Sequence, residues 1–292
     1  MTYKELLTDG IAILTKSDIQ SASTNAELLL CHYANLSKIE LSFKKNEIIN
    51  DISIIENYKK GIIERSTNKP LQYIIGQITF YNISLYINEN VLIPRPETEE
   101  LVELVIKNST ALLKTKTPEI NIIDLCSGSG CVSLALAKHY EKHKNINIVG
   151  IDISKDAVDV ALFNKKNLSL KNINYINIDF FDFIKHQQSN TNSTKYDIIV
   201  CNPPYISESD YHQLDKELFF EPRIALTDEH NGLTFFQAIA DNIDYLLSPK
   251  GTIFFECGLY QAEKIKRLFE EKHHSAIIHK DFAGIDRFLQ IK

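Results

Sequence analysis

The chain has no long hydrophobic run, which excludes a protein anchored by membrane-spanning helices. None of its apolar segments approaches the ~18 residues that such a helix requires. The first turns of the chain carry Lys4, Glu5 and Asp9 among apolar side chains, a pattern that secretory signals do not show. With 292 residues the chain is long enough to bury a core of its own. We therefore expect a cytoplasmic globular protein with no membrane association.

An excess of positive charge is also missing. The 32 Lys and Arg residues are outnumbered by 38 Asp and Glu residues, which gives a formal net charge of −6. The first 90 residues, with 9 basic and 10 acidic side chains, and the remainder, with 23 and 28, share this deficit. Neutralisation of phosphates is the main driving force for sequence-independent binding to nucleic acids. Stable nucleic-acid binding is therefore not expected, although a local basic patch is compatible with this composition.

Cysteines are few, odd in number and scattered, which argues against a disulfide framework. Cys126 and Cys131 are close in sequence, but no second pair of Cys or His residues follows them at the spacing of a zinc site. No metal ligand is predicted, and reduced thiols fit this usage better. The five cysteines are Cys31, Cys126, Cys131, Cys201 and Cys257.

The first 70 residues show the spacing of amphipathic helices. Apolar residues recur three and four positions apart in residues 3–14, 25–36 and 47–64, which predicts a small helical bundle as the N-terminal domain. From residue 71 to residue 93 the rhythm changes, because β-branched and aromatic residues follow one another there. This segment predicts a β-hairpin that joins the first domain to a second one.

Residues 94–292 alternate between short apolar strands and amphipathic helices. This alternation predicts βαβ units, a mostly parallel sheet and an α/β fold. The predicted strands are residues 121–125, 146–151, 173–178, 196–201, 252–256, 276–280 and 286–291. The predicted helices are residues 129–140, 154–168, 233–247 and 261–272, and Pro96 suits the first position of a further helix.

A loop after the first strand of this domain suggests a nucleoside-binding site. Asp124 lies near the end of that strand, and the loop residues are Cys126, Ser127, Gly128, Ser129 and Gly130. Glycine lets the backbone turn tightly and approach a ligand, and the following helix offers free N–H groups. Asp152 ends the next strand, where a carboxylate can accept hydrogen bonds from both hydroxyls of a ribose. A purely structural turn is the alternative, but the placement of Asp152 favours nucleoside binding.

The nucleoside is better matched by S-adenosylmethionine than by a dinucleotide. A dinucleotide loop has a third glycine three residues after Gly130, and that position is Ser133. Asp124 would repel a pyrophosphate, whereas a sulfonium with an amino group suits an acidic rim. The residues therefore favour S-adenosylmethionine as the cofactor before any family is considered.

The most informative motif is Asn202-Pro203-Pro204-Tyr205, directly after the strand 196–201. The two prolines hold Asn202 and Pro203 extended. If this strand lies beside strand 121–125, where open α/β sheets bind their ligands, Asn202 faces the glycine loop. The Asn202 side-chain oxygen and the Pro203 carbonyl can then accept both hydrogens of one NH₂ group, and Tyr205 can pack on the planar group that carries it. The alternative is a loop that only ends a strand.

This motif resembles that of S-adenosylmethionine-dependent methyltransferases that modify planar NH₂ groups. More narrowly, the chain resembles the release-factor glutamine methyltransferases of the HemK (PrmC) type, and the likeness covers nearly its whole length. The shared segments are residues 70–76 (Pro-Leu-Gln-Tyr-Ile-Ile-Gly), 94–99 (Pro-Arg-Pro-Glu-Thr-Glu), 124–130, 202–206, 221–226 and 281–287 (Asp-Phe-Ala-Gly-Ile-Asp-Arg). One departure is Cys126, where the family usually has glycine. The departure matters because the Cβ of a cysteine needs room and a tolerable φ.

The resemblance implies a Rossmann-like class I methyltransferase domain over residues 94–292, with a mostly parallel seven-stranded sheet, a helical domain over residues 1–70 and the hairpin 71–93 between them. It also implies methyl transfer from S-adenosylmethionine to the amide nitrogen (N5) of the glutamine in the Gly-Gly-Gln motif of class-I peptide chain release factors. The implied cofactor contacts are Asp124, Cys126, Ser127, Gly128, Ser129, Gly130, Asp152, Phe180 and Asn202. The implied substrate contacts are Asn202, Pro203, Pro204 and Tyr205, with catalytic roles for Asn202, Pro203 and Tyr205.

Other functions remain open at this point. A nucleic-acid adenine or cytosine amino-methyltransferase shares Asn-Pro-Pro-Tyr, but a basic tract or a base-flipping target domain is then expected. A non-catalytic adaptor is expected to lose motif residues, and all of them are present. The helical N-terminal region is predicted to dock a macromolecular partner. Whether Arg95, Glu97 and Glu221 line a substrate entrance or only shape a helix start and a turn is undecided.

Overall fold

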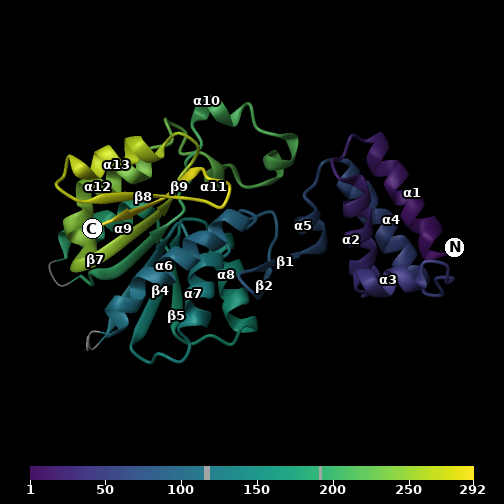
Figure 1. Ribbon diagram of the computed structural model, residues 1–292, viewed down its shortest axis with the longest axis horizontal. Coiled ribbons are helices and arrows are strands. Elements are labelled where there is room, and N and C mark those ends of the chain that lie inside the picture. Colours follow the sequence, from purple (N-terminus) through teal and green to yellow (C-terminus); the bar gives the residue numbers. More distant parts are fainter. Residues whose placement is uncertain (115–118, 191–192) are drawn as a thin grey trace. The chain divides into compact units, whose positions relative to one another are not determined.

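In the computed structural model, residues 1–114, 119–190 and 193–292 are described, and they divide into two units (Figure 1). Unit 1 consists of Met1–Gln77 with Asp215–Phe220, and unit 2 of Ile78–Leu214 with Glu221–Lys292. Within the described residues, no helix has both the length and the apolar character needed to span a bilayer.

Helices make up unit 1, as the spacing of its apolar residues predicts. Thr2 and Ser37 start two of them with capping boxes, in which a side-chain oxygen and a glutamate three residues later satisfy free backbone N–H groups. The buried side chains of Leu6, Leu29 and Ile62 come from three helices and meet in one core. The elements are α1 (Tyr3–Lys16), α2 (Ala22–Ala34), α3 (Lys38–Lys44), α4 (Ile52–Ser66), α5 (Leu71–Ile75) and the 3₁₀ helix η1 (Lys216–Phe220).

Two predicted boundaries in this part of the chain are wrong. The helix predicted from residue 47 begins at Ile52, because Asp51 caps it by accepting a hydrogen bond from the Ser53 N–H. The first residues of the predicted hairpin form the helix α5, which ends at Gly76 in the left-handed conformation that favours glycine. The two strands that follow are therefore short, and they pair with each other as β1 (Gln77–Phe80) and β2 (Ile83–Tyr86).

The predicted seven-stranded, mostly parallel sheet is confirmed in unit 2. Its strand order is β5-β4-β3-β6-β7-β9-β8, and among these described strands β9 alone runs against the others, because it pairs antiparallel with both β7 and β8. The order reverses at β3, which pairs with β4 on one side and with β6 on the other, so that Leu125 lies beside Cys201. The strands are β3 (Ile120–Leu125), β4 (Ile146–Asp152), β5 (Ile173–Asn177), β6 (Tyr196–Cys201), β7 (Leu247–Glu256), β8 (Ala276–Lys280) and β9 (Asp286–Ile291).

Helices cover both faces of this sheet (Figure 1). Buried residues of α9, α12 and α13, such as Phe183, Phe236 and Phe269, form the core on one face. Buried residues of α6 and α7, such as Leu101 and Leu134, form the core on the other face. The helices of unit 2 are α6 (Pro96–Lys114), α7 (Cys131–His139), α8 (Lys155–Asn167), α9 (Phe180–Ser189), α10 (Glu208–Tyr211), α11 (Arg223–Leu226), α12 (Thr234–Leu246) and α13 (Ala262–Glu270).

Candidate active site

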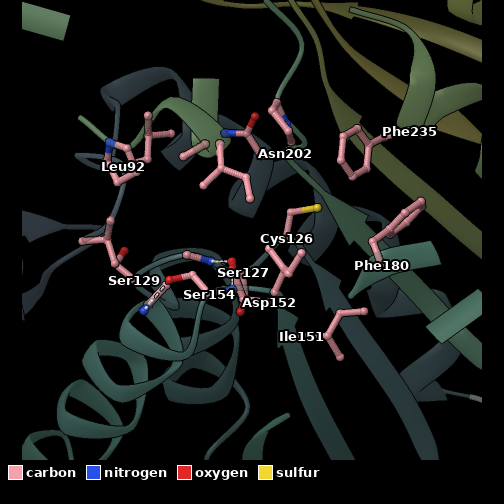
Figure 2. A pocket seen from close by; sticks show the side chains of 18 of the residues that line it. Leu92, Cys126, Ser127, Ser129, Ile151, Asp152, Ser154, Phe180, Asn202 and Phe235 are labelled. Atoms are coloured by element: carbon pink, nitrogen blue, oxygen red, sulfur yellow. Dashed lines mark hydrogen bonds between the residues drawn. The ribbon is translucent and has the colours of Figure 1, made fainter. Parts of the chain in front are cut away.

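A cavity of about 530 Å³ lies in unit 2 at the carboxyl ends of the central strands (Figure 2). This volume is within the usual range of small-molecule sites. Most of the predicted site residues line the cavity, namely Asp124, Cys126, Ser127, Gly128, Ser129, Asp152, Phe180, Asn202 and Pro204. The structure does not place Gly130, Pro203 or Tyr205 on the cavity wall.

The loop between β3 and α7 turns through left-handed backbone conformations. Cys126, Gly128 and Gly130 have φ angles of +62°, +53° and +78°. A Cβ on Gly128 would meet no described atom within 4 Å, whereas a Cβ on Gly130 would lie 2.3 Å from the Tyr175 hydroxyl. Gly130 is therefore needed for packing beneath the loop. Cys126 does carry a side chain in a conformation that favours glycine, as its departure from the family pattern suggests.

Asp152 ties the end of β4 to this loop. Its Oδ2 accepts a hydrogen bond from the Gly128 N–H over 2.8 Å, and its Oδ1 accepts one from the Ser154 N–H over 2.9 Å. Burial raises the pKa of Asp152, and these two hydrogen bonds oppose the rise. Each carboxylate oxygen keeps a further lone pair, so Asp152 can still accept hydrogen bonds from a ribose.

Two other polar residues of the loop region are buried without hydrogen-bond partners for all of their polar atoms among the described residues. Asp124 is 3% exposed and accepts a hydrogen bond from the Ser133 N–H over 3.2 Å. Burial raises the pKa of Asp124 to about 7. The buried Ser127 Oγ finds no hydrogen-bond partner among the described residues. A cavity wall with a buried carboxyl and an unpaired hydroxyl fits a polar, positively charged ligand.

Aromatic rings form another wall of the cavity. The ring centroid of Phe235 lies 4.9 Å from that of Phe180 and 5.6 Å from that of Phe181. Figure 2 shows Phe180 and Phe235 across the cavity from Leu92. The three rings offer the flat apolar surface that a purine base requires. Phe180 is among the predicted cofactor contacts, whereas Phe181 and Phe235 are not. Phe181 lies in α9, which was not predicted, and Phe235 lies in the helix predicted over residues 233–247, whose spacing does not tell which residues face a cavity.

Asn202 lies at the same sheet edge as the glycine loop, because β6 is indeed the neighbour of β3. Asn202 Nδ2 donates a hydrogen bond to Thr98 Oγ1 over 3.5 Å. Tyr205 points elsewhere, since its hydroxyl donates to Glu256 Oε1 over 3.4 Å. Gln261 Nε2 donates a hydrogen bond to the Tyr205 carbonyl over 2.8 Å and so fixes the backbone at the end of the motif. The packing of Tyr205 on the substrate stays a prediction.

Arg95 and Glu221 form an ion pair beside the cavity. Arg95 lines the cavity, whereas Glu221 is buried behind it at 4% exposure. The second carboxylate oxygen of Glu221 accepts a hydrogen bond from the Ile93 N–H over 3.0 Å. Glu221 therefore ties the chain before α6 to the chain before α11.

Comparisons with known proteins agree with this geometry. A PrmC N-terminal domain model matches residues 5–76, and a methyltransferase domain model matches residues 116–285. The release factor glutamine methyltransferase of Thermodesulfovibrio yellowstonii is 36% identical over 90% of this chain and 90% of its own. That of Leptospira interrogans is 35% identical over 97% of this chain and 96% of its own. The chain belongs to the release factor glutamine methyltransferase family. The resemblance inferred from the motifs is thereby confirmed.

A solved structure with the same fold is the hMettl16 catalytic domain in complex with the MAT2A 3′UTR hairpin 6. It superposes with a TM-score of 0.52 at 13% identity, over 81% of each chain. At this identity the likeness concerns the fold alone. It confirms the α/β fold predicted from the alternation of strands and helices and the Rossmann-like methyltransferase architecture that the family resemblance implies.

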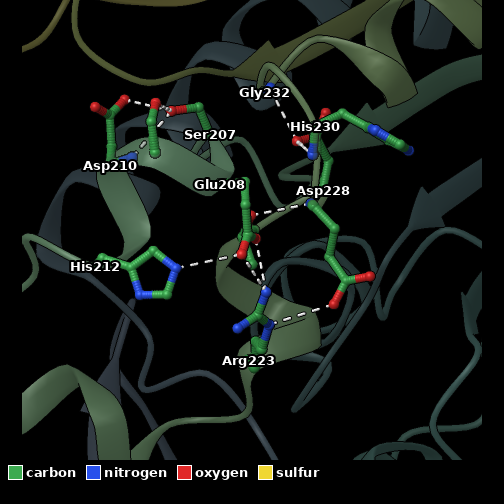
Figure 3. Close-up of polar contacts among 11 residues, drawn as sticks. Ser207, Glu208, Asp210, His212, Arg223, Asp228, His230 and Gly232 are labelled. Atoms are coloured by element: carbon green, nitrogen blue, oxygen red, sulfur yellow. Dashed lines mark hydrogen bonds and ion pairs between the residues drawn. The ribbon is translucent and has the colours of Figure 1, made fainter.

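The methyltransferase has a second polar cluster at the cavity, and no sequence motif predicts it (Figure 3). Arg223 lines the cavity and pairs with Glu208 over 2.6 Å and with Glu229 over 3.3 Å. Asp228 accepts hydrogen bonds from three backbone N–H groups, those of residues 230, 232 and 234. These contacts order the segment between β6 and α12, in which the sequence shows no regular spacing that would have predicted them.

Proposed function

We propose that this methyltransferase transfers a methyl group from S-adenosylmethionine to the side-chain amide nitrogen (N5) of the glutamine in the Gly-Gly-Gln motif of class-I peptide chain release factors. The observation that carries the proposal is the position of Asn202 and its two prolines. These residues follow β6 beside the glycine loop of β3, and Asn202 and Pro204 line the same cavity as that loop. The chain is a member of the release factor glutamine methyltransferase family.

The cavity residues fit S-adenosylmethionine. Asp152 is assigned to the ribose hydroxyls and Phe180 to the adenine. The loop from Cys126 to Gly130 is assigned to the methionine part, with the unpaired Ser127 hydroxyl available for a polar group there. The buried Asp124 favours a cation. The bound cofactor supplies an electrophilic methyl group.

The substrate end of the cavity is assigned to the Asn202 motif. The Asn202 side-chain oxygen and the Pro203 carbonyl accept the two hydrogens of the glutamine NH₂ group. An amide nitrogen is a poor nucleophile, because its lone pair is delocalised into the carbonyl. Holding it in line with the methyl group therefore contributes several kcal/mol, of the order known for oriented reactions. The two acceptors also stabilise the positive charge that grows on the nitrogen during the attack.

Different parts of the chain are assigned different roles. Residues 1–70 recognise the body of the release factor, residues 71–93 connect, and residues 94–292 catalyse. Exposed apolar side chains on α3, Ile39 and Phe43, support a docking role for the first part, because they stand one helical turn apart. A net charge of −6 argues against stable binding to nucleic acid, and five free thiols fit the cytoplasm.

The test is incubation with labelled S-adenosylmethionine and, in separate reactions, an intact class-I release factor, a short peptide that contains Gly-Gly-Gln, DNA and ribosomal RNA. Mass spectrometry should locate one added methyl on the glutamine of the intact factor. The peptide should be modified less efficiently, because it lacks the docking surface. Asn202→Ala should lower kcat by about 100-fold or more and leave cofactor binding nearly unchanged. Methylation of nucleic acid but not of the factor would contradict the proposal.

A further inference from the structure

The rotation of the Asn202 side-chain amide decides whether it can hold a glutamine. An amide presents an oxygen on one side and an NH₂ group of nearly the same size on the other. Only the oxygen accepts a hydrogen bond from the glutamine nitrogen. Turned by half a rotation about its last bond, Asn202 would present NH₂ to NH₂, and the substrate would lose one of its two acceptors.

One buried residue, Thr98, contacts the NH₂ side of this amide, and a second, Glu256, contacts Thr98. Thr98, in the first turn of α6, is 2% exposed, and Glu256, the last residue of β7, is 1% exposed. Thr98 Oγ1 donates a hydrogen bond to Glu256 Oε2 over 2.7 Å. Asn202 Nδ2 donates to the same Thr98 oxygen over 3.5 Å. The three side chains form a row of hydrogen bonds, in which Asn202 donates to Thr98 and Thr98 donates to Glu256.

The carboxylate gives this row its direction. An ionised carboxylate only accepts hydrogen bonds, and the Tyr205 hydroxyl donates to its other oxygen. Since the single hydrogen of the Thr98 hydroxyl is directed to Glu256, Thr98 turns its lone pairs toward Asn202 and pairs with the NH₂ group there. Burial raises the pKa of Glu256, while the Thr98 hydrogen bond and the charge of Arg287 oppose that rise.

We propose that Thr98 and Glu256 are positioning residues for methyl transfer, which turn Asn202 so that Oδ1 faces the glutamine amide. The inference rests on the proposed function, because it takes a glutamine NH₂ group as the substrate. Glu256 does this without lining the cavity, since it acts through Thr98. The 3.5 Å contact between Asn202 and Thr98 is long, and catalytic hydrogen bonds commonly shorten when the substrate binds.

The test compares Thr98→Val, which keeps the shape of the side chain but removes its hydroxyl, with Thr98→Ser, which keeps the hydroxyl. The Val variant should lower kcat on the intact release factor by about 10- to 100-fold, because a misplaced acceptor costs on that order. KM for the factor and Kd for S-adenosylhomocysteine, measured by calorimetry, should stay within about twofold of the parent. The Ser variant should restore most of kcat. Thr252 is a buried threonine of the same strand as Glu256. Thr252→Val is therefore the matched control and should leave kcat unchanged.

A second variant keeps the test decisive if Thr98→Val does not fold. Glu256→Gln retains the shape of the carboxylate but offers a donor in place of one acceptor, so the Thr98 hydroxyl is no longer held in one direction. This variant should also lower kcat with little change in cofactor affinity. The inference is overturned if either folded variant keeps kcat within twofold, or if the loss lies in KM or cofactor affinity instead. Absence of activity in the parent protein would instead refute the proposed function.

Discussion

The two sides of the cavity are held in place by different means. On the cofactor side, the loop after β3 is shaped by its own backbone angles and by a carboxylate only 24 residues away, where Asp152 binds the Gly128 N–H. On the substrate side, single side chains join segments that are far apart in sequence. Glu221 reaches Ile93 across 128 residues, and Glu256 reaches Thr98 across 158.

The two sides should therefore differ in how well they tolerate substitution. A loop whose conformation is set locally should adjust to a change with a modest loss, since its neighbours in sequence still shape it. A wall that depends on one buried carboxylate should fail as a unit when that group is removed.

The largest effect is expected from Glu221→Ala. The substitution leaves the Ile93 N–H and the Arg95 guanidinium without their shared acceptor. Because Arg95 is about one-third exposed, the loss should lie near the lower end of the range for a broken buried pair, about 3 kcal/mol. Thermal unfolding should show a Tm lower by roughly 10 °C, and KM for the release factor should rise more than Kd for S-adenosylhomocysteine.

Glu208→Ala is the matched control for that variant. Glu208 also pairs with an arginine of the cavity wall, Arg223, but both partners are well exposed. Solvent screens an exposed ion pair, so its loss should hardly move Tm. Equal losses in the two variants would show that the buried tie is not what holds this wall.

The residues of the cofactor side could largely be predicted from the sequence, and the contacts that hold the substrate side could not. Two closely spaced glycines, a strand before them and the rule for ligand crevices predict a site of residues 126–130, Asp152 and Asn202, and all of these except Gly130 line the cavity. No spacing rule joins Thr98 to Glu256 or Glu221 to Ile93, because such contacts depend on how helices and strands pack. Tyr205 illustrates the limit, since the motif places it beside Asn202 but only the fold directs its hydroxyl to Glu256. The chemical roles of these residues stay predictions.

A smaller effect is expected from pH on the cofactor side. With a pKa of about 7, Asp124 is protonated in a large share of the free protein at neutral pH. Binding of a cation favours the ionised carboxyl and so lowers this pKa, which means that a proton must be released below pH 7 for binding. Affinity for S-adenosylmethionine should therefore fall by up to about tenfold per pH unit below 7 and stay level above it.

Calorimetry between pH 5.5 and 8.5 checks this dependence. Asp124→Asn, which cannot titrate, should bind more weakly at high pH and show a flatter profile. The comparison matters because Asp152, whose pKa is also raised by burial, lines the same cavity. A profile with the same slope in the Asn variant would assign the dependence to another group.

The smallest effect is expected at Cys126. Its φ of +62° is costly for a residue with a Cβ, so Cys126→Gly should raise the free energy of unfolding by less than about 1 kcal/mol, because the more flexible unfolded chain offsets part of the gain. Cys126→Val should lower it by about 1–2 kcal/mol, since a branched side chain fits this conformation poorly. Cys131, five residues on, begins α7. Cys131→Gly should therefore lower the free energy of unfolding, the opposite of the effect of Cys126→Gly, because glycine weakens helices. Denaturant unfolding of the three variants measures these differences, and a Val variant as stable as the Gly variant would mean that the backbone of this loop does not impose the left-handed angle.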